Sequence, residues 1–211
     1  MDGSGRFDRH VELAATVLLA VAAVATAWSA YQSARWHGQQ ARSQSASVAS
    51  RVESTRAGNM ANRQAQIDVA LFTQWVDAYA RDERNLAGFY RKRFRPEFEP
   101  AFEAWVATKP RTNPMAPLSP FAMPQYKLAA TVQANQLETQ AGAASKLVGV
   151  YIQRADNYSL AVVFFAVSLF FAGISTRLRS VTSRKVVLGL GYAIFFGALI
   201  WIATLPVSVT V

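Results

Sequence analysis

Three long apolar runs interrupt an otherwise mixed chain and dominate its hydropathy pattern. The first run covers residues 11–31 (VELAATVLLAVAAVATAWSAY), and its only charged residue, Glu12, lies near its start. The second run, residues 159–176, and the third run, residues 186–205, carry no charged residue. A helix needs about 20 predominantly apolar residues to cross the hydrocarbon core of a bilayer. The pattern therefore predicts an all-α membrane protein with three transmembrane helices.

Apolar residues recur alternately four and three positions apart in the segment ahead of the second run. They form a helix-pairing seam of nine residues: Ala130, Ala134, Leu137, Ala141, Ala144, Val148, Tyr151, Ala155 and Tyr158. This spacing, sustained for about four repeats, is typical of a helix that pairs with another helix. Because the seam leads directly into the second run, we expect one helix from about Gln125 to Thr176.

The segment after the first run continues the same spacing with mostly small residues. They are Ala30, Ala34, Gly38, Ala41, Ser45, Val48, Val52 and Thr55. Small side chains let two helix axes approach closely, so we expect this face to pair with the seam. Spans one and two would then extend into an antiparallel extra-membrane helical hairpin. The alternative is that these alanines only favour helix formation and face water.

The first helix is expected to end or kink at Gly58-Asn59, because glycine commonly follows a helix end. A separate helix is then expected from Met60 to Phe94. Seven of the eight prolines fall within residues 96–124, and proline removes a backbone donor that a helix needs. This part of the chain is therefore expected to be a connector. Within the connector, the spacing of Phe98, Phe102 and Trp105 predicts a short amphipathic helix. No regular secondary structure is predicted for residues 111–124.

Hydropathy and proline content together predict three regions. They are residues 1–31 (N-terminal tail and first span), residues 32–158 (an extra-membrane helical domain with the proline-rich connector 96–124) and residues 159–211 (spans two and three, joined by the short basic loop 177–185).

Basic residues near the spans predict the orientation. The loop 177–185 contains Arg177, Arg179, Arg184 and Lys185 without an acid, whereas the tail after Leu205 carries no charge. The positive-inside rule places such a loop in the cytoplasm. The N-terminus is then cytoplasmic, whereas residues 32–158 and the C-terminus lie outside. We expect the four cations of the loop to contact lipid head groups.

Aromatic residues near the ends of the runs predict interface anchors, because amphipathic rings suit the head-group layer. These residues are Trp28, Tyr31, Trp36 and Trp201. The first run has a second interpretation as a secretory signal peptide, since Arg6 and Arg9 precede it and Ala25-Thr26-Ala27 resembles a cleavage site. The helical pattern continues unbroken past Trp28, which favours a retained span.

The net charge of +9 raises the question of nucleic-acid binding. The segment 89–95 (FYRKRFR) interleaves cations with aromatic residues, as some nucleic-acid interfaces do. Glu97, Glu99 and Glu103 follow directly, and the predicted orientation keeps the segment outside the cytoplasm. Local ion pairs are therefore expected in place of nucleic acid, with anionic lipid as a second alternative.

Catalytic chemistry finds little support in the composition. The chain has no cysteine and two histidines, and it contains no phosphate-binding glycine loop or nucleophile motif. Asp68, Asp77, Asp82 and Glu83 are interpreted as an ordinary charged helix face. The spans hold no ionisable residue beyond Glu12, which argues against ion-coupled transport. We expect no enzyme, no cofactor and no metal site.

The segment 26–41 (TAWSAYQSARWHGQQA) and the two C-terminal spans with their basic turn resemble a family of bacterial inner-membrane proteins. That family has one N-terminal span, a polar helical middle and two C-terminal spans, and no assigned activity. The resemblance implies a bacterial inner-membrane location and supplies no site residue.

The sequence supports two hypotheses about function. The first is a membrane scaffold or accessory subunit that assembles with itself or another membrane complex. The second is an oligomeric ion channel gated by the extra-membrane helices. Hydroxyls available to line a pore are those of Thr16, Thr26, Ser29 and Ser168.

Overall fold

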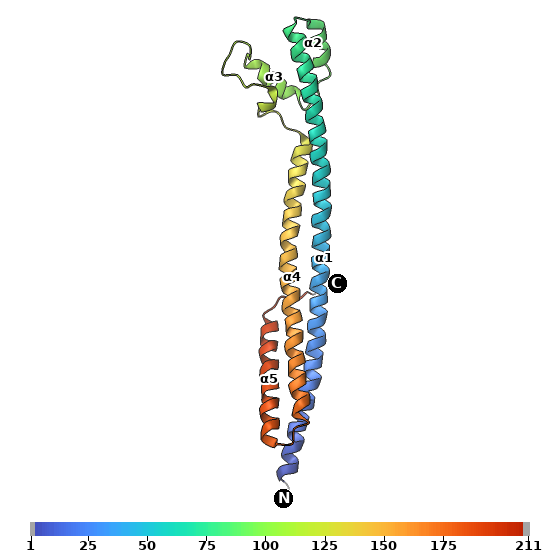
Figure 1. Cartoon of the computed structure of the whole chain (residues 1–211), viewed down its shortest axis with the longest axis vertical. Coiled ribbons are helices and arrows are strands. Elements are labelled where there is room, and N and C mark those ends of the chain that lie inside the picture. The colour runs from blue at the N-terminus through green and yellow to red at the C-terminus, as the bar shows by residue number, and fades with distance from the viewer. Residues whose placement is uncertain (1–2, 209–211) are drawn as a thin grey trace. The chain divides into compact units, whose positions relative to one another are not determined.

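The computed structural model describes the backbone of residues 3–208 and the side chains of residues 10–208. This part of the chain is helical, without strands (Figure 1). Its elements are α1 (Gly3–Ala80), α2 (Arg84–Arg91), α3 (Glu99–Ala107), the short 3-10 helix η1 (Pro120–Ala122), α4 (Ala129–Ser175) and α5 (Val181–Ala203). α1, α4 and α5 are each long and apolar enough to cross a membrane. The side chains of Arg6 and Arg9 and the last three residues of the tail lie outside the described part.

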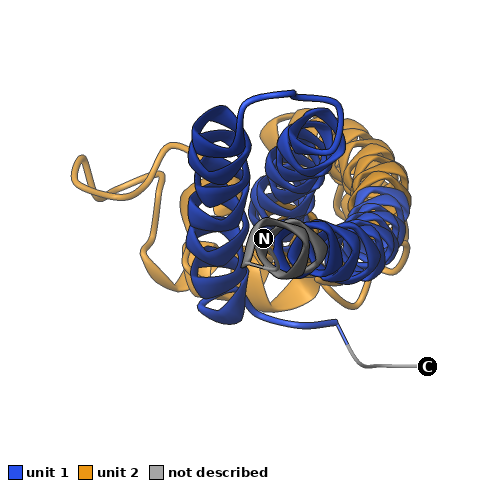
Figure 2. Ribbon diagram, turned by 90° about the horizontal axis from the view of Figure 1, so that it is seen from below, with its two compact units in different colours: residues 1–45, 144–211 blue, residues 46–143 orange. Residues whose placement is uncertain are grey.

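Two compact units divide the chain, and both include parts of α1 and α4. Unit 1 comprises residues 1–45 and 144–211, and unit 2 comprises residues 46–143 (Figure 2). The sequence predicted borders at residues 31/32 and 158/159, where the apolar runs end. The two kinds of border describe different properties. The predicted borders lie where a helix changes from apolar to polar, whereas the compact units group residues that pack against one another.

Unit 1 brings segments of α1, α4 and α5 side by side (Figure 2). Its core combines small and large apolar residues from all three helices: Ala15, Leu18, Ala22, Ala161, Phe165, Ala172, Leu188, Phe195 and Ala198. Gly191 permits a close approach, since a Cβ atom there would lie 3.3 Å from Cβ of Phe171 and 3.4 Å from Leu18. The hydroxyl of Ser168 donates a hydrogen bond of 2.8 Å to the carbonyl of Gly191. Glycine therefore has a packing role at this contact in α5.

Unit 2 pairs the second part of α1 with the first part of α4 in antiparallel fashion. Ser47 donates a hydrogen bond of 3.0 Å to the carbonyl of Ala141, and Ser54 donates one of 2.9 Å to the carbonyl of Ala134. Residue numbers in α1 thus rise as those in α4 fall. The short serine side chains reach backbone carbonyls only where the two helices lie close together.

The prediction of which α1 face is covered was wrong. The residues proposed for it are all exposed: Ala30, Ala34, Gly38, Ala41, Ser45, Val48, Val52 and Thr55. The buried face includes Ser29, Trp36, Ser47, Ala57 and Ala61 instead. Alanine and serine occur all round this helix, so small size does not distinguish one face from another. Hydrogen bonding by Ser47 and Ser54 favours the face that is observed.

The predicted end or kink at Gly58-Asn59 was also wrong, because α1 continues to Ala80. Gly58 lies between the buried residues Ala57 and Ala61, whose packing offsets its low helix propensity. The separate helix expected over residues 60–94 is accordingly replaced by the end of α1 and the short α2. The backbone turns at Asp82, which has a left-handed φ of 60°.

An aromatic cluster joins α1 to the chain around α3. Phe94, Phe98, Phe102 and Trp105 are buried, and Leu71, Phe72 and Trp75 of α1 pack against them. The short amphipathic helix predicted from Phe98, Phe102 and Trp105 is confirmed as α3 and its preceding residue. The indole N–H of Trp105 donates a hydrogen bond of 2.7 Å to the carbonyl of Pro117, which fastens the proline-rich connector to α3. The connector also forms η1, a short 3-10 helix that the sequence did not predict.

Candidate functional site

The nine seam residues all lie on a covered side of α4. Ala141, Ala155 and Tyr158 are buried, and the other six are half-buried. The carbonyls of Ala134 and Ala141 accept the hydrogen bonds from α1 in unit 2. In unit 1, Ala155 and Tyr158 form a small cluster with Trp36. Contacts with α1 are thus present at Ala134 and Ala141 in unit 2 and at Tyr151, Ala155 and Tyr158 in unit 1.

The four aromatic residues expected at interfaces occupy different environments. Trp28 and Tyr31 are exposed and lie close together, with ring centroids 6.0 Å apart. Trp201 is half-buried and contacts the ring of Phe164. Trp36 instead lies inside unit 1, at 6% exposure, because its ring stacks on Tyr151 of α4. Only the first three rings face outward to any extent.

The basic loop between α4 and α5 presents most of its cations at the surface. Arg177, Arg179 and Lys185 are exposed, whereas Arg184 is half-buried in the first turn of α5. The sequence assigned these cations to lipid head groups, and three of them are open to such contact.

A buried polar cluster in unit 1 joins the C-terminal segment to α1. The side-chain carbonyl of Gln32 accepts a hydrogen bond of 3.0 Å from the backbone N–H of Ser208. The hydroxyl of Tyr158 donates one of 3.3 Å to the carbonyl of Pro206. The hydroxyls of Ser33 and Ser159 share a hydrogen bond of 2.9 Å. Polar side chains thus fix this segment against α1 and α4.

Three polar atoms of the same α1 face are buried without a hydrogen-bond partner among the described residues. They are Oγ of Ser29, Nε2 of Gln32 and Nε1 of Trp36. Positions 29, 32 and 36 lie on one side of a helix. The guanidinium of Arg154 lies over the ring of Trp36, 4.6 Å from its centroid. The side chains of Ser29, Gln32 and Trp36 are buried.

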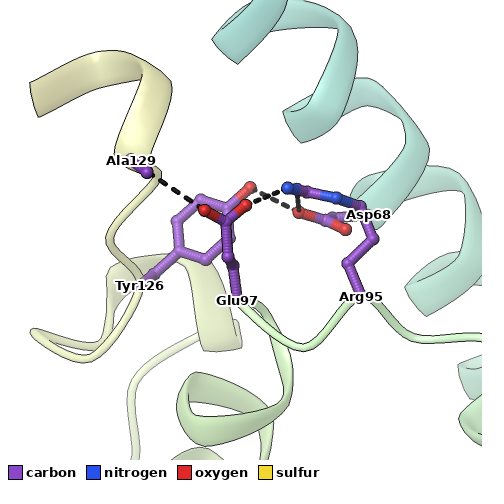
Figure 3. A network of polar contacts seen from close by, with 5 residues as sticks. All are labelled: Asp68, Arg95, Glu97, Tyr126 and Ala129. Carbon is purple, nitrogen blue, oxygen red and sulfur yellow. Dashed lines mark hydrogen bonds and ion pairs between the residues drawn. The ribbon is translucent and has the colours of Figure 1, made fainter. Parts of the chain in front are cut away.

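Unit 2 contains a second polar network, centred on Asp68 of α1 (Figure 3). Its Oδ2 atom accepts hydrogen bonds of 3.0 Å from Nη1 of Arg95 and of 3.0 Å from the hydroxyl of Tyr126. Arg95 also forms an ion pair with Glu97. The other carboxylate oxygen of Glu97 accepts a hydrogen bond of 3.3 Å from the N–H of Ala129. This bond satisfies one of the free backbone donors at the start of α4.

The network links α1, the chain before α3 and the start of α4. Asp68 is fully buried, and burial raises the pKa of its carboxyl above the usual 3.8. The hydrogen bond from Tyr126 and the charge of Arg95 act in the opposite direction, to a smaller extent. Burial and the neighbouring Asp68 carboxylate also raise the pKa of the Tyr126 hydroxyl. The network thus gives the buried Asp68 carboxyl two hydrogen-bond partners, Arg95 and Tyr126, at the point where three segments of the chain meet.

Sequence reasoning missed the role of Asp68, which was assigned to a charged, solvated face. A usable signal existed: Ala61, Asp68, Leu71, Trp75 and Ala78 are separated by seven, three, four and three residues. Asp68 thus lies in the same stripe as the apolar residues that pack on α4 and α3. A carboxylate at such a position needs a partner, and the chain supplies Arg95 from 27 residues away.

Three of the four cations in the basic and aromatic segment 89–95 have local partners. Arg91 forms an ion pair of 3.2 Å with Glu103, and Arg93 lies over the ring of Phe89. Arg95 belongs to the Asp68 network. The local ion pairs expected from the neighbouring acids are therefore present at Glu97 and Glu103.

Among residues 10–208, no three histidine, cysteine, aspartate or glutamate side chains are grouped so as to hold a metal ion. The polar groups described above mainly join segments of the chain to one another. Comparison with known proteins gives no further assignment, because no family model, curated protein or solved structure matches this chain.

Proposed function

We propose that the protein is inserted in a bacterial inner membrane through the apolar parts of α1, α4 and α5. Large apolar side chains on these helices point away from the core of unit 1, and this arrangement supports the proposal. Val24, Val186 and Ile200 are 70%, 66% and 68% exposed. Such side chains are unfavourable in water and favourable in lipid.

The proposed orientation has the loop between α4 and α5 in the cytoplasm and unit 2 outside. The support is the four cations of that loop, together with the uncharged C-terminal tail. Membership of the inner-membrane family with one N-terminal and two C-terminal spans is part of the same proposal.

The function proposed is that of a membrane-anchored scaffold or accessory subunit, which assembles through its extra-membrane helices. One observation carries it: an exposed stripe on α1 in unit 2, here called the valine stripe. It contains Val48, Val52, Val69 and Val76, which are 50%, 45%, 46% and 39% exposed. Val69 also lines a shallow hollow of about 460 Å³, together with Asn62, Ala65, Gln66 and Ala70.

The valine stripe is separated from the buried face of α1 that contacts α4 and the aromatic cluster. Its residues recur at spacings of three and four when the intervening Thr55, Asn59, Asn62, Gln66 and Thr73 are included. Exposed apolar residues in this arrangement are typical of a surface that receives another helix. The amides within the stripe add hydrogen-bonding groups that favour a specific alignment.

Site-specific crosslinking in the native membrane, through a photoreactive maleimide attached to one introduced cysteine, tests this function, because the chain has no cysteine of its own. We expect Val69→Cys to crosslink efficiently, either to a second copy or to a different membrane protein of defined mass. Gln74→Cys, at an exposed position of α1 that is not three or four residues from any member of the stripe, is the matched control and should crosslink much less. Equal yields for the two variants, or a monomer in both, would contradict assembly through the stripe.

The channel hypothesis has weaker support. Ser29 and Ser168 are buried within unit 1, and Ser168 bonds the carbonyl of Gly191. Thr16 and Thr26 donate to carbonyls of their own helix, those of Glu12 and Ala22. The hydroxyls considered for a pore are thus already engaged or covered, so we favour the scaffold.

A further inference from the structure

A small pocket in unit 2 lies where α1 ends and α2 begins, facing the chain that follows α3. Its volume is about 290 Å³, and it is lined by Tyr79, Asp82, Arg84 and Arg111. This volume is near the lower end of the range for small-molecule sites, about 300 Å³. The lining carries two cations and one acid, and these charges favour a small anionic ligand.

Arg111 lies over one ring of an aromatic stack. Its guanidinium lies 5.4 Å from the ring centroid of Tyr79. Tyr79 stacks on Trp75 with a centroid separation of 4.9 Å and an interplanar angle of 10°. Trp75 in turn contacts the buried ring of Phe102 at 4.8 Å. The stack therefore orients the guanidinium before any ligand arrives.

The charge of Arg111 is not compensated by an ion pair with any acid of the described chain. Arg84 is paired with Asp82 at 3.2 Å, but both side chains are more than 80% exposed. Exposed pairs of this kind contribute little stability, about 0–1 kcal/mol. An anion can therefore replace Asp82 as the partner of Arg84 at small cost.

The backbone around the pocket has unusual conformations on two sides. Asp82 and Lys109, with φ of 60° and 54°, are the non-glycine residues that adopt a left-handed conformation in the described part of the chain. Such conformations cost free energy and occur often at ligand sites. Asp82 lies two residues before Arg84, and Lys109 lies two residues before Arg111. Each left-handed residue thus precedes one of the two arginines.

The carbonyls of Ala78 and Tyr79, near the end of α1, are already satisfied within the chain. The N–H of Glu83 donates 2.9 Å to the carbonyl of Ala78, and the N–H of Asp82 donates 3.2 Å to that of Tyr79. These bonds form a Schellman motif, which satisfies carbonyls of the last turn. Among the charged side chains that line the pocket, two arginines outnumber the single acid, which favours an anionic ligand.

We propose that this pocket binds the phosphate or carboxylate group of a small anionic ligand. The planar guanidinium of Arg111 donates to its oxygens, and Arg84 leaves Asp82 to become the second donor. Guanidinium groups match both oxyanions through paired N–H donors. The site adds ligand binding to the scaffold proposed above and does not depend on assembly through the valine stripe.

Calorimetric titration of the full chain in nonionic detergent tests the site, with ionic strength held constant by chloride. Inorganic phosphate and acetate are the two probes, and saturable binding of either supports the proposal while identifying the preferred oxyanion. We expect Arg111→Gln to weaken binding by roughly tenfold or more, because a charge-assisted bidentate contact is lost. Arg81→Gln is the matched control, since Arg81 pairs with Asp77 and does not line the pocket.

Asp82→Asn provides a test with the opposite sign. Asparagine accepts the left-handed conformation, so the turn is kept while the competing carboxylate is removed. We expect this variant to bind the preferred anion several-fold more tightly than the natural sequence. The proposal is overturned if neither anion binds at millimolar concentration, if Arg81→Gln weakens binding as much as Arg111→Gln, or if Asp82→Asn weakens it. Unchanged thermal unfolding of each variant establishes that it is folded.

Discussion

The carboxyl group of Asp68 is subject to opposing influences from its surroundings. Removal from water favours the protonated acid, whereas Arg95 and the hydroxyl of Tyr126 favour the carboxylate. Burial has the larger effect, so the pKa of Asp68 is raised in the folded protein. One carboxylate oxygen, Oδ1, also lacks a partner among the described residues. The ion pair therefore compensates the cost of burial only in part.

A raised pKa determines how stability depends on pH. Between pH 3.8 and the raised value, the folded chain binds the Asp68 proton more tightly than the unfolded chain does. The contribution of Asp68 to the free energy of unfolding is therefore fully present below pH 3.8 and is lost as the pH rises through the raised pKa. Asp68→Asn removes this dependence. We expect the stability of the natural protein relative to Asp68→Asn to fall as the pH is raised from acid to neutral.

Thermal unfolding of the full chain in detergent, followed by tryptophan fluorescence, measures this difference. Trp75 and Trp105 lie in the neighbouring aromatic cluster and report on unit 2. Arg95, Glu97 and Tyr126 are the other ionisable groups of the network, and they remain in both proteins. A relative stability that rises with pH would mean that Arg95 outweighs burial at Asp68.

At the scale of elements, α1 depends on packing to remain continuous over its 78 residues. Gly58 is an unfavourable residue in a helix interior, and no Pro or left-handed residue interrupts the helix there. A Cβ atom added to Gly58 would meet nothing within 4 Å. Glycine is thus not required at this position by a close contact or by its backbone conformation.

We predict that Gly58→Ala stabilises the protein by about 0.5–1 kcal/mol, because alanine loses less backbone entropy in a helix than glycine does. The midpoint of thermal unfolding, followed by circular dichroism, measures the change. Gly38→Ala is a suitable control, since Gly38 is also inside α1 and also has open space around it. Destabilisation by Gly58→Ala alone would indicate a helix end or kink at this position.

At the scale of the molecule, hydropathy and charge together lead to the proposed topology. In that topology, the positive-inside rule assigns the cations between α4 and α5 to the cytoplasm and the neutral tail after α5 to the other side. Unit 2 would then face outward, together with the valine stripe and the anion pocket. Partners and ligands would be drawn from the space outside the cytoplasmic membrane.

Cysteine labelling of intact cells tests this topology. We expect a membrane-impermeant maleimide to label Arg63→Cys in unit 2 and to leave Thr176→Cys, next to the basic loop, unlabelled. Both positions are exposed in the structure, so burial does not explain a difference. Permeabilised cells should show labelling of both variants. The reverse pattern in intact cells would require the inverted orientation, with unit 2 in the cytoplasm.

The positions of most long helices, and which of them are apolar, could be predicted from the sequence. Apolar length predicted the three candidate spans, and the spacing from Ala130 to Tyr158 predicted a long helix that is observed as α4. The last proline of the connector, Pro124, precedes the start of α4 as expected, whereas α1 ends at Ala80, well before the first proline, Pro96. Phe98, Phe102 and Trp105 predicted α3. These features depend on local composition and periodicity, which a single sequence contains in full.

The contacts within the candidate sites could be identified only from the tertiary structure. Asp68 accepts a hydrogen bond from Tyr126, which lies 58 positions away in the sequence. The guanidinium of Arg111 lies over the ring of Tyr79, which belongs to α1. The covered face of α1 was likewise not readable, because alanine and serine surround that helix. The sequence by itself determined where helices form and which of them are apolar, since each turn depends on near neighbours. Only the tertiary structure decided which helix face is covered and which charges meet, because both depend on contacts between residues far apart in the chain.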